Sequence, residues 1–170
     1  MEKLPQRKDL RLKEYDYTAG WYFVTVCTDK KRKILGDVET CEMDVGRGAL
    51  TPPQVRLSNI GQVVEKHLLK ANTIYPDAKI DAYVIMPNHI HLIVAIGAAA
   101  DGGVRAPRPT TLMEIVRSFK SLSTREVGYS IWQTSFYDHV IRNEADYLRI
   151  RQYMDNNPAR WAEDEYYEFS

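Results

Sequence analysis

The segment Lys79 to Ile96, KIDAYVIMPNHIHLIVAI, constrains the fold more than any other part of the chain. Two apolar runs rich in β-branched and aromatic residues flank residues 86–88, Met-Pro-Asn, and this pattern predicts two strands joined by a tight turn. Alternate side chains of a strand share a face, so His89 and His91 should project together. The other face should point into a core and carries Ile90, Leu92, Val94 and Ile96.

The two imidazoles have a spacing that suits a metal ion. Alternate Cα atoms of a strand lie about 6.5 Å apart, which lets both side chains converge on one ion. A His-x-His pair is not specific, because some such pairs only hydrogen bond at a sheet edge. The pair alone therefore leaves a metal site and a structural pair both open.

The composition is that of an ordinary folded domain. At 170 residues, with 44% hydrophobic and 27% charged residues, the chain can bury a core without staples. We expect a single domain over residues 1–170, with flexible loops at 36–54 and 97–109. No apolar run approaches the roughly 20 residues of a membrane span, and the charged first segment is unlike a signal peptide. With two cysteines and no Cys-x-x-Cys pair, these features predict a cytoplasmic protein without membrane contacts.

The formal net charge is zero, which argues against nucleic-acid binding by bulk charge alone. Basic residues nevertheless outnumber acidic ones in residues 1–33 and 105–125. Such patches suit a polyanion bound on one side, although charged runs are also common as solvated surface. The run at residues 29–33, DKKRK, is either a solubilising strand end or a phosphate contact. Candidate nucleic-acid contacts are Lys8, Arg11, Arg105, Arg108, Arg117, Lys120 and Arg142.

The order of the expected elements indicates the fold class. A strand at residues 21–28 precedes a helix capped by Ser58, the central hairpin, and a helix with a capping box at Thr111 and Glu114. A last strand near residues 136–142 leads to a helix over residues 144–157. This order predicts an α+β fold: a ferredoxin-like antiparallel sheet packed with helices, with an extra C-terminal helix.

The C-terminal helix offers a nucleophile. Tyr153 and Asn157 are an i, i+4 pair at one margin of its packed stripe, so they point the same way. A divalent ion held by His89 and His91 can polarise a phosphoryl oxygen while Tyr153 attacks in line, and Asn157 can fill an open coordination position. Two rival tyrosines are less suitable, because one lies in a predicted strand and the other on the packed stripe: Tyr137 and Tyr147.

Four pieces of the sequence together resemble a known family. His89-Ile90-His91 within YVIMPNHIHLIV resembles the His-hydrophobe-His (HUH) motif of single-strand DNA nucleases. With GWYFVTVCT, IWQTSFYDHVIRN and QYMDNNP in the same order, residues 21–161 resemble single-tyrosine transposases, particularly the REP-associated tyrosine transposases.

The resemblance implies a DNA nicking and joining enzyme: a metal-dependent single-stranded DNA endonuclease and strand transferase that acts at DNA hairpins through a 5′-phosphotyrosine intermediate, with Mg²⁺ or Mn²⁺. By motif position, His89 and His91 match the metal ligands, Tyr153 the nucleophile and Asn157 the third ligand. Other members have Gln where this chain has Asn157. Because Asn is shorter than Gln, Asn156 or a water molecule could be the third ligand instead.

Two other functions remain open. One is a catalytically silent regulator that binds hairpin DNA on the same fold, and the other is a zinc hydrolase, whose further ligand signatures are missing from the sequence. The protein can act as a monomer or a homodimer.

Overall fold

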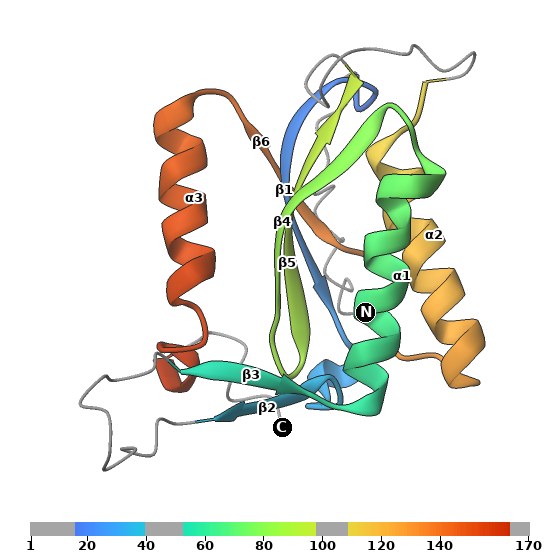
Figure 1. The fold of residues 1–170 in the computed structure, drawn as a ribbon, viewed down its shortest axis with the longest axis vertical. Helices are drawn as coiled ribbons and strands as arrows, with labels where there is room; N and C mark the ends of the chain where they lie inside the picture. The colour runs from blue at the N-terminus through green and yellow to red at the C-terminus, as the bar shows by residue number, and fades with distance from the viewer. Residues whose placement is uncertain (1–15, 40–52, 98–108, 164–170) are drawn as a thin grey trace, which may run out of the picture.

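The computed structural model describes residues 16–39, 53–97 and 109–163 (Figure 1). Six strands and three helices make up the described fold, together with two short helical turns. The strands are β1 (Gly20–Cys27), β2 (Gly36–Glu39), β3 (Gln54–Leu57), β4 (Ala78–Ile85), β5 (His89–Ile96) and β6 (Tyr137–Ile141). The helices are α1 (Asn59–Ile74), α2 (Leu112–Val127) and α3 (Glu144–Asn156), and the turns are η1 (Asp29–Lys31) and η3 (Trp161–Glu163).

The main sheet has the strand order β4-β5-β1-β6, and every neighbouring pair is antiparallel. Each of its two crossovers carries a helix, α1 between β1 and β4 and α2 between β5 and β6. This is the split βαβ arrangement of the ferredoxin-like fold, with α3 added after the last strand. The predicted fold class is confirmed.

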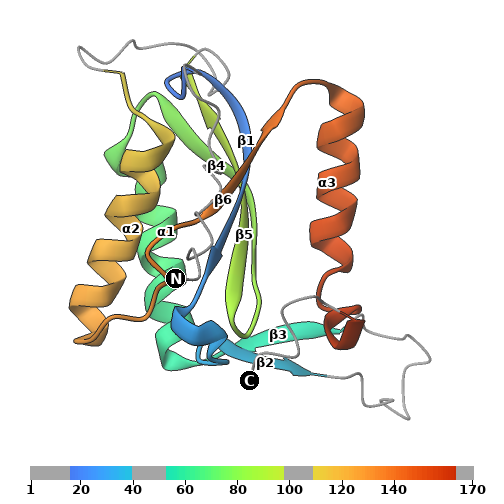
Figure 2. The same ribbon diagram turned by 180° about the vertical axis from the view of Figure 1, so that it is seen from behind.

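The helices cover the two faces of the sheet unequally. Figures 1 and 2 show α1 and α2 side by side on one face and α3 alone on the other. The larger core lies under α1 and α2 and includes the predicted inward-facing residues of β5, Ile90, Leu92, Val94 and Ile96. None of the described helices is long and apolar enough to span a membrane.

A second, smaller core holds α3 against the sheet. It consists of Ala82, Ile93, Ile141, Ile150 and Met154. Because side chains alternate along β5, the face that carries Ile93 also carries His89 and His91. The histidine pair therefore lies on the face covered by α3.

Local signals in the sequence place the helix starts. The Ser58 side chain accepts a hydrogen bond from the amide of Gly61, and Thr111 and Glu114 form the predicted capping box. The Asn143 side chain accepts a hydrogen bond from the amide of Asp146 at the start of α3. These caps satisfy amide groups that the first turn of a helix leaves open.

Two regions add detail to the sequence-based expectation. The segment 36–54, for which the sequence leaves an irregular loop and a short hairpin both open, begins and ends in paired strands, because β2 and β3 form a two-stranded sheet at one end of the molecule (Figure 1). Residues 40–52 and 98–108, the remainder of the two expected loops, lie outside the described part. Trp132 precedes β6 and forms an isolated bridge to Thr28.

Candidate active site

The two imidazoles are buried side by side at the start of β5. His89 is 0% and His91 2% exposed, and their Nε2 atoms are 3.1 Å apart. Their ring centroids are separated by 4.5 Å. The two side chains converge as predicted, and their Nε2 atoms are close enough to be ligands of one ion.

Asn88 orients the ring of His89. The amide nitrogen of Asn88 donates to the carbonyl of Lys31 at 3.2 Å, which leaves the amide oxygen to face His89. That oxygen can only accept, so Nδ1–H of His89 donates to it at 2.9 Å. The lone pair of His89 is therefore on Nε2, the nitrogen that faces His91.

Thr25 orients the second imidazole from the neighbouring strand. Thr25 pairs with His91 in the register of β1 and β5, and its Oγ1 lies 2.8 Å from Nδ1 of His91. A hydroxyl can donate or accept, so it fits His91 with a proton on either nitrogen. Polar partners of this kind orient imidazole ligands in many metal sites.

Both histidines are neutral at physiological pH. Burial lowers the pKa of His89 from 6.5 to about 3; a hydrogen bond with Asn157 opposes this shift, and the charge of Lys31 adds to it. Burial also brings the pKa of His91 well below 6.5, with His89 contributing. Neutral imidazole is the form that binds metal ions.

Tyr153, the predicted nucleophile, reaches the same place from α3. Its hydroxyl oxygen lies 3.4 Å from Nε2 of His91, and the two rings are 5.3 Å apart. Burial of Ile150 and Met154 fixes the rotation of α3 that brings Tyr153 over the histidines. The Tyr153 side chain is 43% exposed, so the phenol stands at the rim of the site.

Asn157 completes the cluster directly after α3. It is 4% exposed and hydrogen bonds to His89. Its side-chain oxygen is buried and accepts no hydrogen bond from the described residues. Two neutral imidazole nitrogens and one amide oxygen form a donor set that fits Mg²⁺ or Mn²⁺ in a mixed site. Within residues 16–39, 53–97 and 109–163, His, Cys, Asp and Glu form no cluster of three or more that could hold a metal.

The rival tyrosines are placed differently. The Tyr147 hydroxyl donates to a carboxylate oxygen of Asp81 at 2.7 Å, and this bond, together with burial, raises the pKa of Tyr147. Tyr147 also packs against the small core under α3, as predicted. Tyr137 lies exposed on β6.

The other two histidines have structural partners. His67 is buried on α1, and its Nε2 lies 2.6 Å from a Glu126 oxygen. Nε2 of His139 lies 2.8 Å from Asp146 and links β6 to the first turn of α3.

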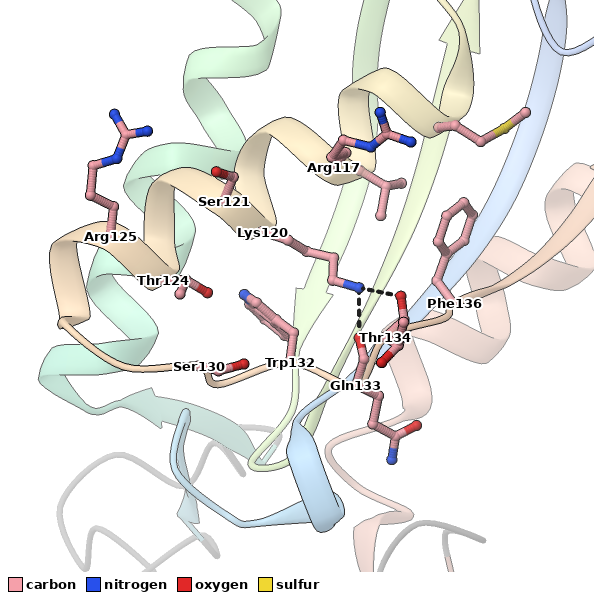
Figure 3. A pocket seen from close by; sticks show the side chains of 12 residues that line it. Arg117, Lys120, Ser121, Thr124, Arg125, Ser130, Trp132, Gln133, Thr134 and Phe136 are labelled. Atoms are coloured by element: carbon pink, nitrogen blue, oxygen red, sulfur yellow. Dashed lines mark hydrogen bonds between the residues drawn. The ribbon is translucent and has the colours of Figure 1, made fainter.

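The predicted nucleic-acid contacts that fall within the described residues do not gather at the histidine pair. Arg117 and Lys120 lie on α2, which covers the opposite face, and line a cavity of about 660 Å³ beside residues 130–136 (Figure 3). The Lys120 ammonium donates to the carbonyls of Gln133 and Thr134 at 2.6 and 3.1 Å, and these bonds hold the segment 130–136 against α2. Arg142 is exposed between β6 and α3. Four candidates fall outside the described residues: Lys8, Arg11, Arg105 and Arg108.

Sequence reasoning missed three residues around the imidazoles. Thr25 and Asn88 fix the two rings, and Trp161 of η3 lies with its ring centroid 6.0 Å from that of His89. The position of Asn88 directly before His89 was the one available signal, because an Asx side chain often bonds a neighbour in sequence.

Comparisons with known proteins agree with this fold. No protein-family model matches the chain. An uncharacterized protein of Haemophilus influenzae is 32% identical over 179 residues, which cover 95% of this chain and 93% of that protein. The REP-associated tyrosine transposase of Escherichia coli K12 is 30% identical over 83 residues, 48% of this chain and 45% of that protein.

A solved structure of a REP-associated tyrosine transposase bound to a REP hairpin superposes with a TM-score of 0.62 at 22% identity. The superposition covers 89% of this chain and 73% of that one. The fold is therefore that of the REP-associated tyrosine transposases. The chain belongs to one family with the Haemophilus influenzae protein, and its fold is REP-associated tyrosine transposase-like.

Proposed function

We propose that the chain is a metal-dependent single-stranded DNA endonuclease and strand transferase that acts at DNA hairpins through a 5′-phosphotyrosine intermediate. The observation that carries this proposal is the Tyr153 hydroxyl, 3.4 Å from Nε2 of His91 at the exposed rim of a buried imidazole pair. The transposase-like fold supports it, as does the hairpin bound to the superposed relative.

His89, His91 and Asn157 are the residues that would hold Mg²⁺ or Mn²⁺. Bound there, the ion supplies Lewis-acid chemistry, polarising a phosphoryl oxygen and stabilising the charge that develops on it. The donor set supports this assignment because both imidazoles are neutral and their Nε2 atoms converge.

The burial of the histidines and the exposure of Tyr153 indicate the side from which DNA would approach. The imidazoles are buried and the phenol is 43% exposed, so we expect a phosphate to approach from the side of Tyr153. Tyr153 and Asn157 lie on successive turns at the end of α3, which places the nucleophile beside the third ligand. Because a packed helix already holds both groups in position, little further orientational entropy is lost when the substrate binds.

The proposed reaction exchanges one phosphodiester for another. The Tyr153 oxygen bonds to phosphorus as the bond between phosphorus and the 3′ oxygen of the preceding nucleotide breaks. The phenolic proton passes to solvent, and the departing 3′ oxygen takes up a proton. The products are a 5′-phosphotyrosine and a free 3′ hydroxyl, and the reverse attack by a 3′ hydroxyl rejoins a strand.

Tyr153 is the preferred nucleophile over the two rivals. The carboxylate of Asp81 disfavours ionisation of Tyr147, which its raised pKa reflects. Tyr137 is exposed on β6, and no contact between its ring and the imidazoles is recorded in the described part of the chain.

The remaining assignments follow from the same proposal. We propose one domain over residues 1–170, active in the cytoplasm as a monomer or homodimer. Hairpin contacts are proposed at Lys8, Arg11, Arg105, Arg108, Arg117 and Arg142. Lys120 is a weaker candidate than the sequence suggested, because its ammonium already donates to two carbonyls.

A denaturing gel tests the nucleophile. The full chain is mixed in Mn²⁺ with a labelled hairpin oligonucleotide that has single-stranded flanks, and a denaturant-stable adduct is expected. Tyr153→Phe should abolish the adduct while hairpin binding stays within about two-fold, because it removes one oxygen and keeps the ring. Tyr137→Phe, the matched control, should label like the parent. An adduct that persists in Tyr153→Phe would assign the nucleophile elsewhere.

The same gel separates the two candidate functions on this fold. Binding without any adduct in the parent protein, across Mg²⁺ and Mn²⁺, would leave the silent hairpin-binding regulator as the better account. Adduct formation that is lost in both His89→Ala and His91→Ala supports the enzyme.

A further inference from the structure

The turn that follows β1 has an unusual backbone. Lys30 and Lys31 both have left-handed conformations, with φ values of 53° and 52°. The amide of Arg32 donates to the carbonyl of Asp29 at 3.3 Å, so the two lysines occupy the central positions of a tight turn. Turns with positive φ at both positions favour Asn-Gly, because a Cβ atom is disfavoured there. Two consecutive lysines in this conformation destabilise the fold. Such strain persists where surrounding contacts hold the backbone in place, and it is common at functional sites.

Hydrogen bonds hold this turn against the histidine site. The amide of Lys31 donates to the carbonyl of Thr28 at 3.0 Å, and the Thr28 hydroxyl donates to the carbonyl of Arg32 at 2.8 Å. The side chain of Asn88 donates to the carbonyl of Lys31 and accepts from His89. One amide side chain thus fixes both the strained turn and the orientation of an imidazole.

The lysines of the turn bring positive charge to the same place. Burial and, to a smaller extent, the charge of Lys31 lower the pKa of His89. The Lys33 ammonium lies 5.7 Å from the centre of the Trp161 ring, and that ring lies against His89. Asp29, the one acid of the DKKRK run, is 3.9 Å from Arg32 within the run itself.

We propose that residues 29–33 form a phosphate-binding element that holds the backbone of single-stranded DNA beside the scissile position, with Lys31 as its principal cation and Lys33 at its edge. This inference rests on the proposed function. A solubilising strand end would explain lysines here but not their strained backbone, since exposed lysines serve that role on any unstrained turn. The bond from Asn88 to the Lys31 carbonyl instead holds the backbone of the lysine turn beside the imidazoles.

The salt dependence of binding tests the element. Affinity of the full-length chain for a fluorescein-labelled hairpin oligonucleotide with single-stranded flanks is measured by anisotropy over a range of salt concentrations. Lys31→Gln should weaken binding about ten-fold and lower the slope of log K against log salt by about 0.7, the value for one phosphate contact on a single strand. Lys31→Arg should restore both values. Lys70→Gln, with the same charge change on α1, should leave both unchanged.

A second variant separates binding from stability. Replacing Lys30→Asn together with Lys31→Gly relieves the backbone, so the melting temperature should stay equal or rise while affinity falls. A purely structural turn would show the stability change with unaltered affinity, and that result overturns the proposal.

Two experimental outcomes distinguish the phosphate-binding element from the proposed function. A parent protein that forms the tyrosine adduct, with Lys31→Gln keeping the parental salt slope, rejects the phosphate-binding element alone. A parent without adduct in either metal rejects the proposed function.

Discussion

At the scale of single residues, the site depends on the groups behind the imidazoles. Asn88 fixes the proton of His89 on Nδ1, and Thr25 holds His91 from the neighbouring strand. The imidazole nitrogens thereby face each other rather than the surrounding backbone. Ring orientation set by such partners commonly changes metal affinity 10- to 100-fold.

Thr25→Val tests this support. Valine matches the shape of threonine but removes the hydroxyl, so His91 loses its partner and the affinity for Mn²⁺ should fall by about 10- to 100-fold. Isothermal titration of the full-length protein measures the loss. Thr25→Ser, which keeps the hydroxyl, should bind like the parent, and equal affinities for Val and Ser would contradict the orienting role.

The third ligand can be tested in the same titration. Asn157 is buried beside His89, whereas Asn156 is exposed. Asn157→Ala should therefore weaken Mn²⁺ binding about ten-fold or more, and Asn156→Ala should leave it unchanged. A loss confined to Asn156→Ala would transfer the ligand role to that neighbour.

At the scale of secondary-structure elements, Asp77 joins three parts of the fold. It lies between α1 and β4, and its carboxylate accepts hydrogen bonds from the amide and hydroxyl of Thr110, next to the start of α2. Its carbonyl accepts a bond from the amide of Gly97 after β5. Burial raises the pKa of Asp77, but the hydrogen bonds from Thr110 outweigh it and leave the pKa below 3.8.

Asp77→Ala should lower the free energy of unfolding by about 1–3 kcal/mol at pH 7, since it removes a buried acceptor of two hydrogen bonds. Because the folded pKa lies below the unfolded value, this stabilisation is present above about pH 3.8 and is lost as pH falls through the folded pKa. The difference between parent and variant should therefore shrink in acid. Urea unfolding at pH 7 and pH 3 measures it, with Thr110→Ser as a control that keeps both donors. A difference that is constant with pH would assign the effect to packing.

At the scale of the whole molecule, the two faces of the sheet serve different purposes. The face under α1 and α2 carries the larger core, while the face under α3 combines a small core with the polar cluster. The proposed ion would join β5 to the end of α3, because two of its ligands belong to the strand and one follows the helix. A bound ion should therefore stabilise the docking of α3 in particular.

Hydrogen exchange can detect this selective effect. At 100 times Kd, Mn²⁺ should add about 2.7 kcal/mol to the free energy of unfolding, and among amides that exchange through local opening it should slow those of α3 more than those of α1. Tyr153→Phe should retain the effect, while the double variant His89→Ala, His91→Ala should lose it. Equal slowing throughout the protein would point to ion binding elsewhere.

Much of the fold follows from interactions between near neighbours in sequence. The helix caps at Ser58, Thr111 and Asn143 each involve residues three positions apart. Alternation along β5 depends on a period of two residues and correctly separated the core face from the histidine face. The position of Tyr153 at the margin of the packed stripe follows from the helical period in the same way.

The surroundings of the imidazoles depend on contacts between residues that are far apart in the sequence. Thr25 and His91 are 66 residues apart, Lys31 and Asn88 are 57 apart, and Tyr153 and His91 are 62 apart. These contacts depend on the register of β1 with β5 and on the face that α3 covers. Which side chains share a face can be predicted from the sequence, because the backbone period sets it. Distances between faces of different elements arise only when the sheet pairs and the helices pack, so the role of Thr25 and the place of the lysine turn beside the imidazoles could not be predicted.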